Sequence, residues 1–380
     1  MSGNSLAERI FQRVQEMGIE GDLARYSGLE PSRLQAIQNG DPFSASEYEQ
    51  LCRAVAVDPV AMYRGEETRP QRIPARFRAA TSLDSPDASD VRILAMAAEM
   101  GRILAHLVGM QGEEIAIARH RKILGVGGSA EPWREGYALG EQARGLLRSE
   151  SGPVHELERL LNDLGVHIAR IALSSTDVDA ASIWEPGAVP VILLNRLSKR
   201  KHPGALRATL AHELCHLLHD AGEGDITTMV SWGTEQTGNY SNAVEMRARA
   251  FSPSFLAPRS QVLGWARELG KAVREDDDRL VYELASHWGL SFEGAAWHAK
   301  NCDLIRAESA EDLARRPRKP RISYELFETV QTDVPPAMFH DLLPEDPAPL
   351  WQGWAAGIVI VSMEEGQITT GRARELLTWS

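Results

Sequence analysis

Residues 212 to 216 read His-Glu-Leu-Cys-His, and this pentapeptide constrains the fold more than any other part of the chain. From residue 205 to residue 219 the chain is rich in alanine and leucine and lacks glycine and proline, which predicts a helix. On a helix, positions i and i+4 lie on one face, so His212 and His216 can bind one metal ion together. Glu213 lies slightly off that line, where a carboxylate can deprotonate a water molecule on the metal.

The pentapeptide by itself is weak evidence for a metal, because it also occurs by chance on ordinary buried helices. A catalytic zinc site usually has three protein ligands and one open position for water. A second helix-like segment, AVEMRARAFSPSFLAP, spans residues 243–258 and follows a polar loop at 233–243. Glu245 stands near the start of this segment, and a carboxylate there would complete a three-ligand site.

The two segments together resemble a known family. HELCHLLH followed by VEMRARAFSPSFLAP is similar to the ImmA/IrrE metallopeptidases, whose pattern is HExxH, then a glutamate on the next helix, a phenylalanine and a Leu-x-x-Pro-like end. PVILLNR at 190–196 resembles the strand before the active-site helix of that family. The resemblance covers roughly residues 130 to 300 and implies a zincin-like peptidase core.

The resemblance also implies the chemistry of the site. It makes His212, His216 and Glu245 the ligands of a Zn²⁺ ion, and it makes Glu213 the general base. Zinc would polarise the scissile carbonyl and lower the pKa of its water, while Glu213 takes the proton and later delivers it to the leaving amine. The expected activity is therefore that of a zinc metalloendopeptidase, a hydrolase.

The chain departs from the family pattern at two positions. Cys215 stands where the family usually has glycine, and Arg249 stands where it often has asparagine. Neither departure removes a ligand. We interpret Cys215 as a small core residue, with a redox-sensitive thiol beside the metal as the alternative.

Supporting residues are less well defined by the sequence. Asp220 or Glu223 could supply a carboxylate that orients a ligand. His287 and His298 lie in a later helical segment and read as packing or surface residues, with stabilisation of the oxyanion by one of them as the alternative.

Two segments have the apolar patterns of β-strands, VHIARIAL at 166–173 and PVILLN at 190–195. Zinc peptidases commonly hold the substrate as an extra strand along a sheet edge beside the metal. The second segment is therefore either such an edge strand or an interior strand without a role in binding.

Residues 6–65 read as four or five short helices and resemble a helix-turn-helix domain of the XRE/Cro type. The resemblance implies a recognition helix that begins with Ser32, Arg33 and Gln35 and faces base edges. The segment has six arginines, no lysine and nine acidic residues, whereas DNA phosphates need cations. Two hypotheses are kept for it, namely operator binding and recognition of a partner protein of the same fold.

These segments predict a mainly α fold with a small β-sheet (α+β). It comprises a zincin-like peptidase core, a helical N-terminal domain and a helical C-terminal region. The predicted divisions are a helix-turn-helix domain, a linker with a bridging helix, the peptidase core, a helix-turn-helix-like helical subdomain and a C-terminal helical tail, at residues 1–66, 67–125, 126–260, 261–312 and 313–380.

The composition limits the partners and the cellular compartment that we expect for this chain. The net charge of −12 gives no general attraction to nucleic acid or to anionic membranes. We expect no membrane association, since no apolar run looks long enough to cross a bilayer and the N-terminus lacks a signal-peptide pattern. The three cysteines are widely spaced and odd in number, which favours a reducing, cytoplasmic environment.

Two functional hypotheses follow. Members of the resembled family typically cleave a helix-turn-helix repressor and so switch on stress, phage or mobile-element genes. The first hypothesis is therefore a zinc endopeptidase whose protein substrate is such a repressor. The second is a DNA-binding transcriptional regulator or antitoxin-like protein, in which the peptidase domain acts as a sensor or as the platform of a homodimer.

Overall fold

The computed structural model has the predicted fold class, mainly α-helical with one small β-sheet. The described residues are 5–65, 87–121, 131–147, 151–220, 227–232, 243–316, 319–327 and 349–379. Most of the predicted linker after residue 66, the polar loop from 233 to 242 and Glu223 lie outside the described residues.

A four-stranded sheet forms the centre of the molecule. Its strands are β1 (His167–Ile171), β2 (Val178–Trp184), β3 (Val191–Asn195) and β4 (Thr227–Trp232), in the order β1-β3-β2-β4. β3 is parallel to β1 and antiparallel to β2, and β2 is antiparallel to β4. The strand predicted from PVILLN is thus an interior strand, and the alternative of a substrate-binding edge is wrong for it. β4, which no sequence pattern predicted, is an edge strand of the sheet that the described residues form.

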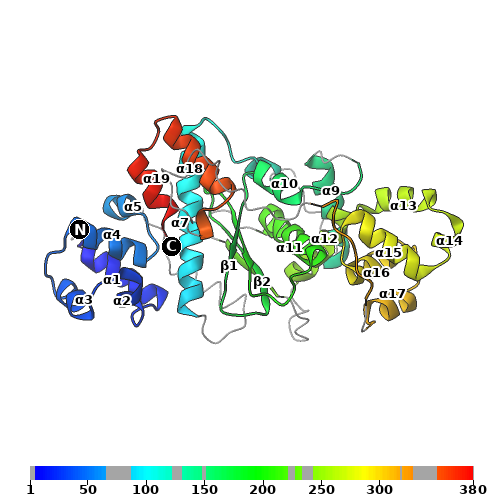
Figure 1. Cartoon of the computed structure of the whole chain (residues 1–380), viewed down its shortest axis with the longest axis horizontal. Coiled ribbons are helices and arrows are strands. Elements are labelled where there is room, and N and C mark those ends of the chain that lie inside the picture. Colours follow the sequence, from blue (N-terminus) through cyan, green and yellow to red (C-terminus); the bar gives the residue numbers. More distant parts are fainter. Residues whose placement is uncertain are drawn as a thin grey trace.

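Helices cover both faces of the sheet (Figure 1). They are α7 (Ala88–Met110) and α18 (Trp354–Glu364) on one face and α11 (Pro203–Cys215) on the other. Val191 and Leu193 of β3 belong to the α7 core, whereas Ile192 and Leu194 belong to the α11 core. Because successive side chains of a strand point to opposite faces, the continuous apolar run of β3 fits a strand that is buried on both sides.

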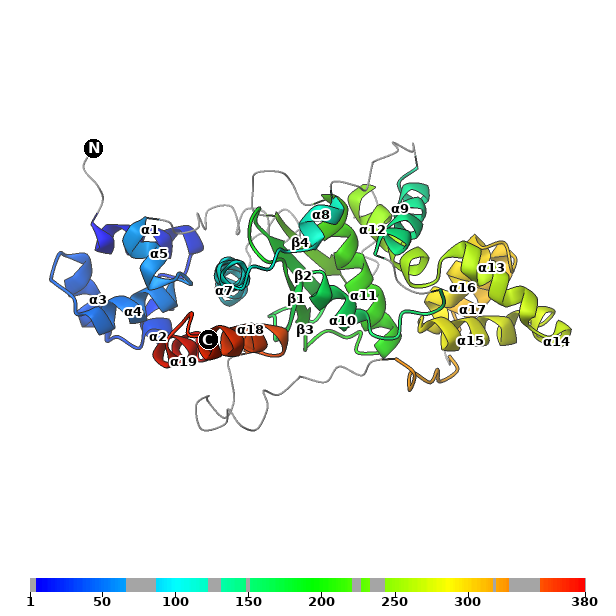
Figure 2. The same ribbon diagram turned by 90° about the horizontal axis from the view of Figure 1, so that it is seen from above.

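Helix α7 corrects the expectation that no apolar run of the chain is long enough to cross a bilayer. It is the one helix among the described residues that is long and apolar enough to cross a membrane by length and composition. However, 61% of its most apolar window is buried within the protein. Figure 2 shows the helix end-on between the N-terminal helices and the sheet. A helix with packing partners on several sides is apolar nearly all round, so its hydropathy reflects a core position.

The N-terminal module consists of five short helices. They are α1 (Leu6–Met17), α2 (Leu23–Ser27), α3 (Pro31–Gln38), α4 (Ala45–Ala54) and α5 (Pro59–Arg64). Ser5 and Ser44 form capping boxes with Glu8 and Glu47 and so define the first turns of α1 and α4. The apolar side chains of the module join those of α7, α18 and α19 (Thr370–Leu377) in a single core.

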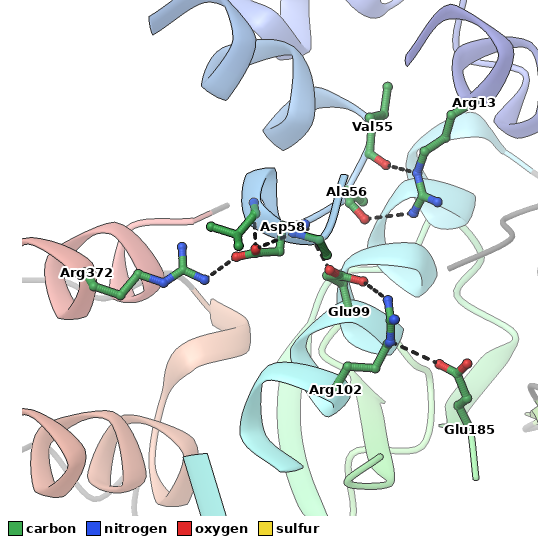
Figure 3. A network of polar contacts seen from close by, with 10 residues as sticks. Arg13, Val55, Ala56, Asp58, Glu99, Arg102, Glu185 and Arg372 are labelled. Atoms are coloured by element: carbon green, nitrogen blue, oxygen red, sulfur yellow. Dashed lines mark hydrogen bonds and ion pairs between the residues drawn. The ribbon is translucent and has the colours of Figure 1, made fainter. Parts of the chain in front are cut away.

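A network of charged side chains ties this module to the rest of the chain (Figure 3). Asp58, the N-cap of α5, accepts a hydrogen bond from Arg372 of α19. The backbone N–H of Asp58 donates to the buried carboxylate of Glu99 at 2.9 Å. Arg102 donates to the other oxygen of Glu99 at 3.0 Å and lies 3.6 Å from Glu185, which follows β2. The N-terminal module, helices α7 and α19 and the end of β2 therefore meet at one junction.

The opposite end of the elongated molecule is also helical (Figures 1 and 2). Its helices are α13 (Arg259–Glu268), α14 (Lys271–Arg274), α15 (Asp277–Trp288), α16 (Phe292–Asn301) and α17 (Ala307–Ala314). The remaining described helical segments are α8 (Ile117–Arg121), α9 (Pro132–Leu146), α10 (Leu157–Asp163), the π-helical turn η1 (His216–Asp220), α12 (Ala243–Leu256) and the 3₁₀ turn η3 (Pro349–Trp351).

Two glycines let α9 lie directly on α12. A Cβ on Gly136 would lie 2.2 Å from the carbonyl oxygen of Arg247, and one on Gly140 would lie 2.8 Å from that of Phe251. No real side chain tolerates such distances to backbone atoms. This close packing brings the start of α9 beside the first turns of α12, where Glu245 lies.

Candidate metal centre

Helix α11 and the π-helical turn η1 that continues it carry the first two candidate ligands, whereas the sequence predicted one α-helix through residue 219. His212 lies in the last turn of α11, and His216 is the first residue of η1, so the helix widens where the motif ends. The Nε2 atoms of the two rings lie 2.9 Å apart, and both residues are buried. Single π-helical turns are rare and frequently mark functional sites.

Glu245, in the first turn of α12, brings a carboxylate to the same point. Its oxygens lie 3.3 Å from His212 Nε2 and 3.4 Å from His216 Nε2. Ligand atoms about 2.0–2.1 Å from a tetrahedral zinc ion are roughly 3.3–3.4 Å from one another. The ligand atoms of the three residues lie within 4.8 Å of one another, so this donor set fits a single metal ion.

The residues His212, His216 and Glu245 form a cluster whose surroundings favour a positive charge. Burial opposes a charge on His216, but the carboxylates of Asp220 and Glu245 outweigh it and raise the pKa of His216 to about 10. Burial also opposes a charge on Glu245, yet hydrogen bonds to His212 and His216 hold the pKa of its carboxyl far below the ordinary value. The same carboxylates would stabilise a divalent cation, which displaces the proton because a ligating imidazole is neutral.

Glu213 is fully buried next to this cluster. Its negative charge is one of the influences that raise the pKa of His216, so the carboxylate acts on the ligand histidine through space. Neighbouring Cys215 is also fully buried and lies in the apolar core under α11. Burial raises the pKa of the Cys215 thiol well above its ordinary value, which keeps it protonated.

A chain of charged groups contacts the Nδ1 side of the His216 ring. Its Nδ1 lies 2.8 Å from Asp220 Oδ2, and Arg247 donates to the other oxygen of Asp220. Arg247 also reaches Glu135 of α9 at 3.4 Å, and Glu135 in turn lies 3.7 Å from His219 Nε2. Such partners fix the tautomer and the orientation of a ligating histidine. Asp220 thus occupies the position that the sequence suggested for it or for Glu223.

The cluster opens into a cleft with a volume of about 670 Å³. His212 and Glu245 line one part of it, together with Asp179 of β2. Asp179 is buried and accepts a hydrogen bond from Ser198 at 2.5 Å, while Arg200 lies 3.5 Å from its other oxygen. Burial raises the pKa of the Asp179 carboxyl despite these contacts. A volume of this size is typical of clefts that hold a ligand.

The two histidines considered for the oxyanion differ in position, because His298 is part of the wall of the cleft and His287 is not. Both ring nitrogens of His298 are engaged, because Nε2 donates to Ala257 O at 2.7 Å and Nδ1 accepts from Tyr137 Oη at 2.9 Å. Burial lowers the pKa of His298 to about 4, so the ring is neutral. His287 stacks on Trp265, with ring centroids 5.2 Å apart, and does not line the cleft. His287 is a packing residue, and the ring of His298 is held by hydrogen bonds to Ala257 and Tyr137.

The residues predicted to contact DNA lie on α3, in the N-terminal module and apart from the metal cluster. Arg33 donates to Glu47 at 2.6 and 3.1 Å and to Pro42 O at 2.7 Å. Gln35 donates to Asn39 at 3.3 Å, and Ser32 is exposed. The guanidinium of Arg33 is therefore held by its own module. The helix-turn-helix assignment and the DNA contacts stay predictions.

Sequence reasoning did not find Arg247, Glu135 or Asp179. Arg247 lies two residues after Glu245 and could have been noticed as the next charged residue on the same segment. Glu135 and Asp179 come from α9 and β2, far from the motif in sequence. No local pattern distinguishes them from other acidic residues.

The fold brings two histidines of a helix-borne HExxH motif together with a downstream glutamate, a donor set that could hold one metal ion and that is typical of zinc peptidases. Residues 161–298, which contain the whole cluster, match the family model described as the IrrE N-terminal-like domain, Peptidase_M78. This match supports the ImmA/IrrE family and a metallopeptidase-like function. No curated protein and no solved structure matches the chain.

Proposed function

We propose that the protein is a zinc-dependent endopeptidase. The observation that carries this proposal is the convergence of His212, His216 and Glu245 within 4.8 Å, beside the buried Glu213 and at the wall of a cleft. Two imidazoles and one carboxylate suit Zn²⁺, and three protein ligands leave a position for the reacting groups.

Each residue of the site has a role in this proposal. His212, His216 and Glu245 hold the zinc ion, which when bound polarises the scissile carbonyl and acidifies water. Glu213 accepts a proton from the attacking water and transfers it to the leaving amine. Asp220 and Arg247 keep the ring of His216 in the orientation that presents Nε2 to the metal.

We infer that the substrate is a protein, and that it is a transcriptional repressor of the helix-turn-helix type. The resemblance to the ImmA/IrrE peptidases supports this substrate class, and its cleavage would derepress stress, phage or mobile-element genes. Purified protein should contain one zinc per chain, and the variant His212→Ala should lose it. Incubation with the repressor encoded beside this chain should yield a discrete cleavage product. A zinc-loaded protein that leaves every such repressor intact would contradict the substrate class.

We assign the N-terminal module to recognition of a protein partner. The engagement of Arg33 with Glu47 and the excess of acidic residues in the module both weaken an interaction with phosphates. A gel-shift titration with salt separates the two hypotheses. No shift at low salt agrees with protein recognition, whereas a shift that weakens steeply with salt would identify a DNA-binding module.

A further inference from the structure

The cleft extends well beyond the metal cluster, between α12 and α16. On α12, Arg249 lines the cleft one helical turn after Glu245, which places its Cα about 6 Å farther along the helix. On α16, Glu293, Trp297 and Lys300 line the cleft at spacings of four and three residues, so that one face of this helix forms the wall. A polypeptide at the metal would therefore extend its neighbouring side chains toward these residues.

Two tryptophans make part of this cleft apolar. Trp133 at the start of α9 and Trp297 of α16 both line it, and they are 40% and 42% exposed. Indole side chains that are half-exposed in a concave surface gain most when a large apolar group covers them. Most tryptophans of the described chain are more deeply buried, so the exposure of these two is a local property of the cleft.

Among the described residues of the cleft, each acidic side chain either has a cationic neighbour or belongs to the candidate metal site. Glu293 lies 2.5 Å from Lys319, and Asp179 lies 3.5 Å from Arg200. Glu245 belongs to the metal cluster. None of these carboxylates therefore attracts a basic substrate side chain strongly.

Two further cations face the same space. Arg249 is exposed on α12, and Lys300 of α16 donates to the neutral amide oxygen of Asn301 at 3.3 Å. Among the described residues that line the cleft, Arg200, Arg249 and Lys300 balance the charges of Asp179, Glu245 and Glu293, so a bound divalent ion would make the lining net positive in a chain whose net charge is −12. Charges that line a cleft with low-dielectric walls act more strongly on a ligand than charges spread over an open surface.

We propose that Arg249 and Lys300 determine the substrate specificity by binding an acidic side chain close to the scissile bond, while Trp133 and Trp297 bind a large apolar side chain of the same segment. This inference rests on the proposed peptidase function, and it names the class of segment that enters the cleft. Carboxylates form charge-assisted hydrogen bonds with guanidinium and ammonium groups, and aromatic side chains stack on indoles.

The test uses the full-length zinc-loaded protein and a library of acetylated octapeptides with randomised central positions. The variant Glu213→Gln is immobilised, and the retained peptides are sequenced by mass spectrometry. Retained peptides should be enriched in Asp or Glu beside an aromatic or large aliphatic residue, by roughly five- to tenfold over the input. Adding Arg249→Gln and Lys300→Gln should abolish the acidic preference, and Arg249→Glu with Lys300→Glu should reverse it toward Lys and Arg. The control Arg267→Glu, an exposed cation on α13 outside the cleft, should leave the preference unchanged.

Zinc content and circular dichroism should be equal in all variants, which excludes unfolding as the cause of a change. Retention without acidic enrichment, no retention of any peptide, or an enrichment that survives both substitutions would overturn the inference. Cleavage of the same library by the protein with Glu213 intact separates the two proposals. Cleavage without acidic preference contradicts the specificity alone, whereas charge-selective retention without any cleavage contradicts the peptidase function alone.

Discussion

The Nδ1 atom of His216 lies 2.8 Å from a carboxylate oxygen of Asp220, one π-helical turn farther along the chain. The other oxygen of Asp220 accepts from Arg247, two residues after the candidate ligand Glu245. One buried carboxylate thus connects the helix that carries the two histidines with the helix that carries the glutamate. Asp220 therefore links the second candidate ligand to the helix of the third through two contacts, one with each of its oxygens.

Replacing this carboxylate should weaken metal binding without removing a ligand. We expect Asp220→Asn to lower the zinc affinity by about 10- to 100-fold, because the amide holds the imidazole less firmly and lowers its basicity. Competition with a chromophoric chelator measures the change. Asp177→Asn is the matched control, since Asp177 pairs with Lys199 at 2.6 Å near the surface. Equal affinities of both variants would contradict the supporting role of Asp220.

The variant Glu213→Gln separates metal binding from proton transfer. Gln has nearly the same shape as Glu but cannot accept a proton at neutral pH, so the zinc content should stay at one per chain. Cleavage of the protein substrate should fall by about 10²-fold or more, in keeping with the loss of a general base. Cleavage at the original rate would rule out the proposed role of Glu213.

The close approach of α9 to α12 at Gly136 can be tested with two substitutions on α9. Gly136→Ala should lower the free energy of unfolding by about 2–3 kcal/mol, because the added methyl group meets the backbone of α12. Gly145→Ala, near the end of the same helix, meets no atom within 4 Å and should be neutral or stabilising by up to about 1 kcal/mol. Urea unfolding at constant zinc concentration gives both values, and similar effects of the two substitutions would argue against close packing of the helices.

The neutral, buried His298 should make the stability depend on pH. Its pKa is lowered by burial from 6.5 to about 4, so the unfolded chain binds a proton in this range and the folded protein does not. The contribution of His298 is complete above about pH 6.5 and is lost as the pH falls toward 4, by about 3 kcal/mol in total. Unfolding free energies between pH 4 and 7 should show a shallower slope for His298→Gln than for the original protein. The exposed His106→Gln should keep the original slope, and an unchanged slope in His298→Gln would refute the assignment.

The spacing of His212 and His216 was enough to predict the two candidate ligands that come from one helical segment. The distance of four residues between His212 and His216 converges on one point in any α-helix, whatever surrounds it. A strand at 190–195 and a helix that begins near Glu245 were also predicted, since their apolar patterns depend on neighbours in the sequence. Strand β2, whose seven residues are all buried, and strand β4 were not predicted.

The tertiary structure decided everything that depends on residues distant in sequence. It placed PVILLN inside the sheet, buried the apolar helix α7 between two layers, and brought Glu135 to Arg247 across 112 positions of the chain. The sequence by itself determined which residues can bind a metal, because ligand chemistry and helical spacing are local. The supporting carboxylates and the cleft with Arg249 and Lys300 arise only when separate helices pack, because their contacts are made between elements and leave no periodic pattern in either one.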